Sequence, residues 1–406
     1  MPQLDRTRAE RLMRAAGIDA MVLFQPENFT YATGLAPGVA AMWRRAGAVA
    51  ALVPSDATAR VVALVGDLNP PSEPPDVDLR THRLWVDTVD LSDWPRSGGE
   101  PAEIVAAAYR KQGNTPRPET FDFQGVLKML ADVLGERGLS RARVGVDLAF
   151  VSVADWQIIT AALPALVWVD CSPTIRELRA IKSPAEIALL RRAAAYAEAG
   201  IVALRDSIAE GVSQRALSLC WRNAVTAAAE GAPDLTGMWD FVSVGPDLWK
   251  GSGVVRQGAV IKADVGAVVG GYSSDGARTF VFGSSDPIVR YVYPALQEAF
   301  EAGLAAIRPG TLLRDVYAAT AGRLARSLPG YRRGHFGHGV GASVGSEEWP
   351  FISANSDTVI EPGMVLAFET PFYGDGLGAL MIEDQLLVTS DGIETMTTLP
   401  RELVRL

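Results

Sequence analysis

The stretch "DVGAVVGGYSSDGARTF", residues 264–280, places two aspartates eleven residues apart in an apolar, glycine-rich context. On one straight strand this separation spans about 36 Å, and the odd spacing points Asp264 and Asp275 to opposite faces. The two carboxylates can act together only if the chain folds back between them. A turn centred between Val269 and Gly270 predicts a hairpin in which Asp264 stands directly opposite Asp275.

A second segment repeats this design. In "GAVIKAD" (258–264) and in "GMVLAFE" (363–369), a glycine opens an apolar strand that ends at a carboxylate. With "GDGLG" (374–378) as the second loop, Glu369 is predicted to face Glu383. Helices precede the strands in both segments, so we expect an α+β domain built from two half-repeats with pseudo-twofold symmetry.

Opposed carboxylates on apolar strands repel one another unless something offsets the repulsion. Protonation, an arginine or lysine partner, or a divalent cation can do so. Two such pairs in equivalent positions favour the cation, because both pairs converge on the boundary between the half-repeats.

Histidines bear on the kind of cation. Of the three in the chain, His335 and His338 lie in "GHFGHGVG" (334–341), just before the strand that bears Glu369. An imidazole beside carboxylates is typical of a transition-metal site rather than of a calcium or magnesium site. Four carboxylates and His338 suit two divalent ions about 3.5–4 Å apart that share an activated hydroxide. This arrangement predicts a hydrolytic reaction.

Length and composition predict two domains. A chain of 406 residues, 48% of them hydrophobic, can bury a large core. Alternating helix and strand patterns predict an α/β domain over residues 1–171, interrupted by a proline-rich, irregular excursion at 67–101. The second domain, 172–406, opens with a long helix, since Ser183, Pro184 and Glu186 form a capping-box pattern.

The charge pattern excludes several classes of partner. With a net charge of −9 and no basic run, the chain lacks the positive surface charge that attracts nucleic acid or an anionic membrane. No apolar run approaches the roughly 18 residues that a membrane span needs, and the first residues lack a secretory pattern. Cys171 and Cys220 are the two cysteines, which predicts a reducing compartment. We expect a cytoplasmic protein.

Five motifs follow one another along the chain: "ELRAIKSPAEIALLRRA", "DVGAVVGGYSSDGARTF", "GHGVG", "EPGMVLAFET" and "IEDQLLVT". They resemble the pita-bread metallopeptidases, the family of aminopeptidase P, prolidase, methionine aminopeptidase and creatinase. The resemblance covers residues 172–406, and the α/β domain before it resembles the amino-terminal domain of the prolidase and creatinase branch. It implies a pita-bread catalytic domain, a homodimer and two divalent ions. Manganese is expected first, with iron, cobalt and zinc as alternatives.

The resemblance also implies roles for particular residues. The family's five metal ligands fall on Asp264, Asp275, His338, Glu369 and Glu383. In the peptidases, the glutamate that matches Glu369 is implicated as the proton shuttle for the metal-bound hydroxide. Glu369 and His338 are therefore the implied catalytic residues.

The substrate side departs from the family pattern. Proline-directed peptidases carry a histidine four residues before the ligand histidine, where this chain has Gly334. The proline that often follows the fourth ligand is replaced by Thr370, and the arginine that often precedes "IED" by Met381. These departures predict that the chain is not an efficient general Xaa-Pro peptidase.

A more aromatic substrate pocket is expected in consequence. Its candidate residues are His335, Trp249, Lys250, Trp349 and Tyr373, and Trp239 is a further aromatic residue that could line it. Such residues favour a compact or cationic small molecule. Each tryptophan also fits a core-packing role, and Lys250 also fits an exposed surface.

The leading hypothesis is a dinuclear metallohydrolase that cleaves a C–N bond, amide or peptide, in a small molecule or short peptide by a metal-bridged hydroxide. One alternative is a metal-dependent lyase, since the dimethylsulfoniopropionate lyase uses a related scaffold. Another is a non-catalytic binding module, against which the retention of all five ligands argues.

Overall fold

The computed structural model describes residues 3–68, 70–92, 94, 99–112, 116–343 and 347–406. The chain divides into two compact units, Met1–Leu178 and Arg179–Leu406. The domain border expected at residue 172 falls at the start of helix α8 (Ser172–Ala180), which spans the change between the units. None of the helices in these ranges combines the length and apolarity needed to cross a bilayer.

Unit 1 is built on a six-stranded mixed sheet in the order β4-β3-β2-β1-β5-β6. Side chains of β1 alternate between two buried clusters, Met21 and Leu23 in one and Ala20 and Val22 in the other, so both faces of the sheet are covered. This confirms the expected α/β domain. Its strands are β1 (Ala20–Leu23), β2 (Ala50–Pro54), β3 (Val61–Gly66), β4 (Val77–His82), β5 (Arg143–Val146) and β6 (Val167–Asp170).

The helices of unit 1 include α8, in a segment that the sequence pattern read as a polar link. They are α1 (Arg6–Ala15), α2 (Pro26–Thr33), α3 (Ala40–Trp43), α5 (Pro101–Gln112), α6 (Phe123–Glu136), α7 (Val153–Ala162) and α8. The proline-rich excursion, expected to be irregular, contains the edge strand β4. It was missed because only its first and last residues, Val77 and His82, are buried, so no apolar run marks it.

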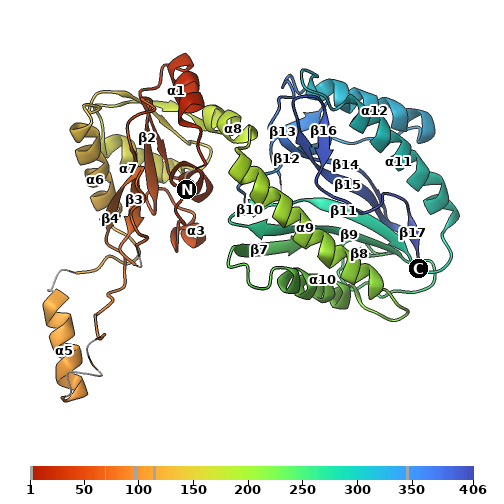
Figure 1. The fold of residues 1–406 in the computed structure, drawn as a ribbon, viewed down its shortest axis with the longest axis horizontal. Helices are drawn as coiled ribbons and strands as arrows, with labels where there is room; N and C mark the ends of the chain where they lie inside the picture. The colour runs from red at the N-terminus through yellow and green to blue at the C-terminus, as the bar shows by residue number, and fades with distance from the viewer. Residues whose placement is uncertain (1–2, 69, 93, 95–98, 113–115, 344–346) are drawn as a thin grey trace. The chain divides into compact units, whose positions relative to one another are not determined.

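Unit 2 holds an eleven-stranded sheet covered by two helix pairs (Figure 1). Helices α9 and α10 pack on β9, where Leu204, Trp221 and Ile261 share one buried cluster. Helices α11 and α12 pack on β14 and β15, with the rings of Phe300 and Phe368 4.8 Å apart. Each half-repeat thus has its own helix pair, as the pita-bread resemblance implies. The four helices are α9 (Pro184–Asp206), α10 (Gln214–Ala228), α11 (Pro287–Ala306) and α12 (Leu313–Ser327).

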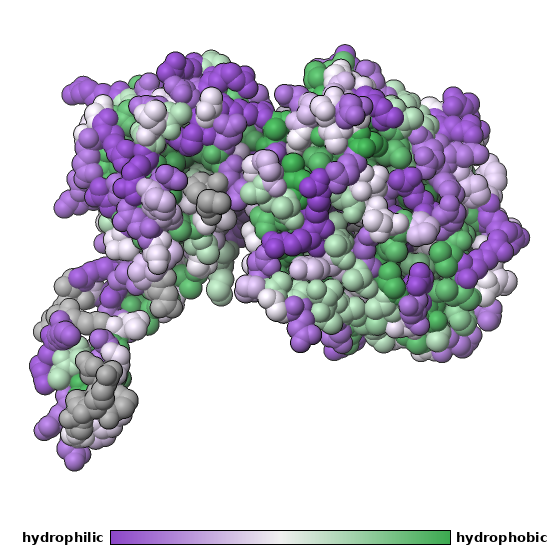
Figure 2. Space-filling view, in the orientation of Figure 1, coloured by the Kyte–Doolittle hydropathy of each residue, from purple (hydrophilic) through white to green (hydrophobic). Residues whose placement is uncertain are grey.

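The strands of unit 2 place the carboxylates in the middle of the sheet. Along the outer edge of this unit, where α11 and α12 lie, Figure 2 shows mainly hydrophilic residues, so the apolar faces of the helices are turned inward. The strands are β7 (Leu235–Asp240), β8 (Ser243–Val244), β9 (Val260–Val269), β10 (Tyr272–Ser273), β11 (Gly276–Val281), β12 (His335–Gly339), β13 (Glu348–Ser353), β14 (Val365–Gly374), β15 (Gly378–Val388), β16 (Ile393–Thr395) and β17 (Val404–Arg405).

Helix α9 begins where the sequence predicts. The Ser183 hydroxyl accepts a hydrogen bond from the backbone N–H of Glu186 at 3.2 Å, and the Glu186 carboxylate accepts one from the N–H of Ser183 at 2.7 Å. Pro184 occupies the first helical turn, where its missing N–H costs nothing. The capping box is confirmed.

The two predicted hairpins have different outcomes. In the second, Glu369 pairs with Glu383 as predicted. In the first, Val269 pairs with Tyr272 and Asp264 pairs with Ala277, so the predicted pairing of Asp264 with Asp275 was wrong.

The turn residues explain the true register. A two-residue hairpin turn of the favoured type needs positive φ at both central positions. Gly270 and Gly271 have φ of 57° and 83°, whereas the predicted turn would have placed Val269 in that region. The register differs from the predicted one by two residues, so both aspartates stay on the same face of the sheet.

A break between β10 and β11 sets the position of Asp275. Residues 274 and 275 lie outside both β10 and β11, and the Ser274 hydroxyl accepts a hydrogen bond from the N–H of Ala267 at 3.1 Å. The N–H of Asp275 donates to the Gln385 side chain of β15 at 3.2 Å. On the opposing strand, a Cβ added at Gly266 would meet the carbonyl oxygen of Ser274 at 2.2 Å and the Trp239 ring at 2.4 Å. Only glycine lets these segments approach so closely.

We therefore predict that Gly266→Ala lowers the free energy of unfolding by about 1–3 kcal/mol, because the methyl group overpacks a rigid backbone. Gly237→Ala on the neighbouring β7 is the matched control, since its Cβ would meet only Val268 at an ordinary 3.6 Å. It should change stability by less than about 0.5 kcal/mol. Urea unfolding of both variants measures the difference, and equal effects would contradict the packing argument.

Candidate metal centre

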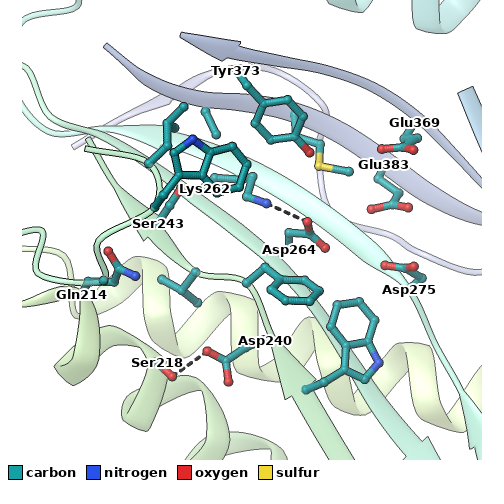
Figure 3. Close-up of a pocket in the computed structure, with 18 of the residues that line it drawn as sticks. Gln214, Ser218, Asp240, Ser243, Lys262, Asp264, Asp275, Glu369, Tyr373 and Glu383 are labelled. Carbon is teal, nitrogen blue, oxygen red and sulfur yellow. Dashed lines mark hydrogen bonds and ion pairs between the residues drawn. The ribbon is translucent and has the colours of Figure 1, made fainter. Parts of the chain in front are cut away.

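One pocket of unit 2, with a volume of about 710 Å³, is lined by all five predicted metal ligands. Figure 3 shows the carboxylates of Asp264, Asp275, Glu369 and Glu383 directed toward the same space. His338 belongs to the same lining. The sheet therefore brings together residues that are up to 119 positions apart in the sequence.

The strand register explains how the carboxylates converge. Ala277 of β11 pairs with Asp264 of β9 on one side and with Glu383 of β15 on the other, and Glu383 pairs in turn with Glu369 of β14. Three carboxylates thus form a row across four strands, with the small Ala277 between them. Asp275 lies two residues from Ala277 and projects from the same face.

His338 is placed by a tight crossing of strands. Gly337 has a φ of 135°, and a Cβ there would lie 2.0 Å from the carbonyl oxygen of Ala367. The His338 Nδ1 lies 3.1 Å from the carbonyl oxygen of Gly339, so Nδ1 carries the proton and Nε2 is free to act as a ligand. Nε2 lies 3.5 Å from an Asp275 carboxylate oxygen.

The five side chains fall into two groups. Ligand atoms of Asp275, His338 and Glu383 lie within 4.8 Å of one another. The other two carboxylates are held by cations that the sequence analysis missed. Lys262 Nζ lies 2.7 Å from Asp264 Oδ2, and Arg333 Nη2 lies 2.6 Å from Glu369 Oε1.

A sequence signal existed for one of these cations. Lys262 precedes Asp264 by two residues on an apolar strand, and the period of two places both on one face. Arg333 lies in an irregular segment before β12, where no periodicity indicates a direction. Its contact with Glu369 follows from the fold alone.

Burial governs the protonation of the cluster. It raises the pKa of Glu383 well above its usual value, and the charges of Asp275, Glu369 and Asp264 raise it further. Burial also raises the pKa of Glu369 to about 6, although Arg333 opposes the shift. Burial lowers the pKa of His338, which keeps the imidazole neutral and able to bind a metal.

These residues fit a divalent ion. Glu383 is 1% exposed, and its Oε2 atom is buried with no hydrogen-bond partner among the described residues. Such an atom is costly unless a cation satisfies it. Carboxylate oxygens with one neutral imidazole form a donor set that first-row transition metals accept.

Two of the predicted substrate residues lie at this pocket. Trp249, 78% exposed, and Tyr373 both line it, with ring centroids 6.0 Å apart. Trp239 and Met381, which the sequence also assigned to the substrate side, line it as well, and so does Phe241, which was not predicted. Phe241 was missed because an aromatic residue in an apolar stretch also fits a core.

The other three predicted substrate residues lie outside the lining. His335 approaches Glu369 instead, with its Nδ1 atom 3.5 Å from Glu369 Oε1. Trp349 is half-buried and packs against the core beneath α11 and α12. Lys250 has a side chain that is 76% exposed and pairs with Asp247 at 2.9 Å. Their roles in substrate binding stay predictions.

Comparison with family models agrees with the motifs. The model of the creatinase/prolidase N-terminal domain matches residues 6–68 and 80–181, and that of metallopeptidase family M24 matches residues 188–390. The chain belongs to the M24 metallopeptidase family. It is accordingly a metal-dependent hydrolase, which confirms the resemblance drawn from the motifs.

Individual relatives of this M24 chain include peptidases. It is 27% identical over 286 residues to the putative dipeptidase YkvY of Bacillus subtilis, spanning 70% of this chain and 78% of the relative. It is 30% identical over 233 residues to an Xaa-Pro dipeptidase of Pyrococcus horikoshii, spanning 57% and 66%.

Solved structures share its fold. The Xaa-Pro dipeptidase from Bacillus anthracis matches with a TM-score of 0.76 and 22% identity over 99% of both chains. The N-terminal domain of the FACT complex subunit SPT16 from chickpea matches with a TM-score of 0.68 and 17% identity, over 97% of this chain and 96% of that one. The pita-bread fold by itself therefore does not specify an activity.

The raised carboxylate pKa values predict a pH-dependent response to metal. The folded pKa of Glu369, about 6, exceeds its ordinary value of 4.5, so the metal-free native chain holds an extra proton between these values. The contribution of Glu369 to stability is therefore largest below this window and is lost as the pH rises through 6. Divalent ions replace the protons, so they should stabilise the chain more at pH 7.5 than at pH 5.0.

Thermal unfolding with excess MnCl2 or with EDTA measures this difference. We expect manganese to raise the melting temperature by roughly 5 °C or more at pH 7.5 and by much less at pH 5.0. Equal shifts at the two pH values would contradict the assignment of raised pKa values to the ion-binding carboxylates.

Proposed function

We propose that the five side chains Asp264, Asp275, His338, Glu369 and Glu383 hold two divalent ions, and that the chain uses them to hydrolyse a C–N bond in a short peptide or small amide. The observation that carries this proposal is the convergence of these residues on one pocket, together with the buried Glu383 oxygen that has no hydrogen-bond partner in the described part of the chain. Membership of the M24 family supports the same chemistry.

Two ions bound in this way supply a Lewis acid for the carbonyl oxygen and lower the pKa of a water molecule. The chain's own residues then handle the protons. The Glu369 carboxylate can accept a proton and return it to the departing nitrogen. The Arg333 guanidinium holds Glu369 in position through their 2.6 Å contact.

The pocket favours a small substrate with apolar groups. Its volume matches that of sites for drug-sized ligands. Trp239, Phe241, Trp249 and Tyr373 supply apolar and aromatic walls. Met381 adds a thioether where the family pattern has an arginine, which supports our proposal that general Xaa-Pro dipeptides are not the best substrates.

Further proposals rest on the family resemblance. Manganese is the metal we expect first, with iron, cobalt and zinc as alternatives. We also propose a homodimer, and a cytoplasmic location in keeping with the two free cysteines.

The proposal predicts that metal-loaded protein hydrolyses members of a panel of small amides and Xaa-Pro dipeptides. Asp264→Ala should reduce turnover by roughly 100-fold or more, because it removes a ligand. Asp247→Ala is the matched control, since that acid pairs with Lys250 outside the pocket lining and should keep most of the activity. Product formation in ¹⁸O-labelled water, followed by mass spectrometry, measures the reaction.

The products distinguish three outcomes. Products that contain one solvent oxygen support hydrolysis. An alkene product without solvent oxygen would identify a lyase and contradict our proposal. Xaa-Pro dipeptides that outperform every amide would leave hydrolysis standing and overturn only the predicted substrate preference.

A further inference from the structure

The pocket carries its positive charges unevenly. Asp264 and Glu369 each contact a lysine or arginine, at 2.7 Å and 2.6 Å. Both lie outside the close group of Asp275, His338 and Glu383, whose ligand atoms are all within 4.8 Å of one another. The two ion positions that five ligands can form are therefore surrounded by different charges.

Lys262 is fixed in this arrangement. Its backbone lies inside the sheet, paired with Ser243 of β8 on one side and with Thr279 of β11 on the other. The residue is 5% exposed, and its ammonium lies 5.7 Å from the centre of the Tyr373 ring. Neither a shift of the strand nor a swing into solvent can remove the ammonium from Asp264 at low cost.

Arg333 is placed less rigidly. It lies in the irregular segment before β12, and 21% of its side chain is exposed. Its guanidinium also approaches the Tyr373 ring, at 5.8 Å. An arginine at a pocket wall can turn aside more easily than a lysine inside a sheet, so Lys262 is the stronger constraint on ion binding.

A fixed ammonium disfavours a divalent ion at the same carboxylate. The two cations repel each other, and at a buried site solvent screens that repulsion only weakly. The Asp264 charge is also already offset by Lys262, so it attracts an incoming ion less. At Glu383 the opposite holds, because its Oε2 atom has no hydrogen-bond partner among the residues described.

We propose that Lys262 weakens the binding of the ion that Asp264 helps to hold. The first ion binds to Asp275, His338 and Glu383, and the ammonium of Lys262 weakens the binding of a second ion at Asp264 by at least tenfold. This inference rests on the ligand set of the proposed function, but it concerns ion binding and not turnover.

Titration of the metal-free, full-length chain with MnCl2, followed by calorimetry, tests the inference. The wild-type chain should show one tight and one weak ion. Lys262→Met, which keeps the length and apolar stem without the charge, should tighten the second ion at least tenfold and leave the first within threefold. Lys250→Met is the matched control, since it removes an exposed lysine that pairs with Asp247, and both affinities should stay unchanged.

Two further variants separate charge from packing. Lys262→Gln removes the charge but can still donate a hydrogen bond to Asp264. It should tighten the second ion as Lys262→Met does, and it serves as the test if Lys262→Met fails to fold. Lys262→Arg keeps the charge and should keep the weak second ion. Electron paramagnetic resonance adds a structural readout, because two adjacent manganese ions give a spin-coupled signal. That signal should appear at two equivalents in Lys262→Met but only at a large excess in the wild type.

Two equally tight ions in the wild-type chain would overturn the inference. An unchanged second affinity in both neutral variants would overturn it as well. Neither result would contradict the proposed hydrolysis. Conversely, a chain that cleaves no amide could still show the predicted ion affinities. The failures of the two proposals are therefore distinguishable.

Discussion

The mutual repulsion of four buried carboxylates on one face of a sheet is the constraint on which the rest of unit 2 depends. Asp264, Asp275, Glu369 and Glu383 are each less than 9% exposed, so water cannot offset their charges. The chain offsets them with Lys262 and Arg333, and burial with the neighbouring acids keeps the pKa of Glu383 high. The divalent ions that we propose for this site would relieve the remaining charge and supply the proposed chemistry.

The architecture around this cluster supplies rigidity. Each half of the sheet is held by its own helix pair, and the row from Asp264 to Glu369 crosses four consecutive strands. Because the backbone of every strand in the row is fixed by its neighbours, the ligand side chains are preorganised and need little rearrangement to accept an ion. The glycines at 266 and 337 permit the close backbone approaches that bring Asp275 and His338 into the same pocket.

The substrate side follows a different physical logic from the metal side. Its residues come from the exposed loop around Trp249, from the end of β14 at Tyr373 and from β7. Loops and strand ends tolerate substitution because few main-chain contacts depend on them. A pita-bread chain can therefore keep its carboxylates and change its substrate, and the likeness to the N-terminal domain of a FACT complex subunit shows how widely the fold is used.

By itself, the sequence determined the two-domain organisation, the capped start of α9, the pairing of Glu369 with Glu383 and the residue types of the candidate ligands. Those features follow from local periodicity, from capping and from motifs that are contiguous in the chain. The register of the first hairpin was mispredicted because the positive φ of two adjacent glycines, not the symmetry of the carboxylates, decides where that turn lies. The period of two along β9 already placed Lys262 on the face of Asp264, but only the tertiary structure decided that Arg333 holds Glu369 and that Lys250 lies outside the pocket lining. Contacts between side chains on different strands depend on sheet register and burial, and no local pattern of residues carries that information.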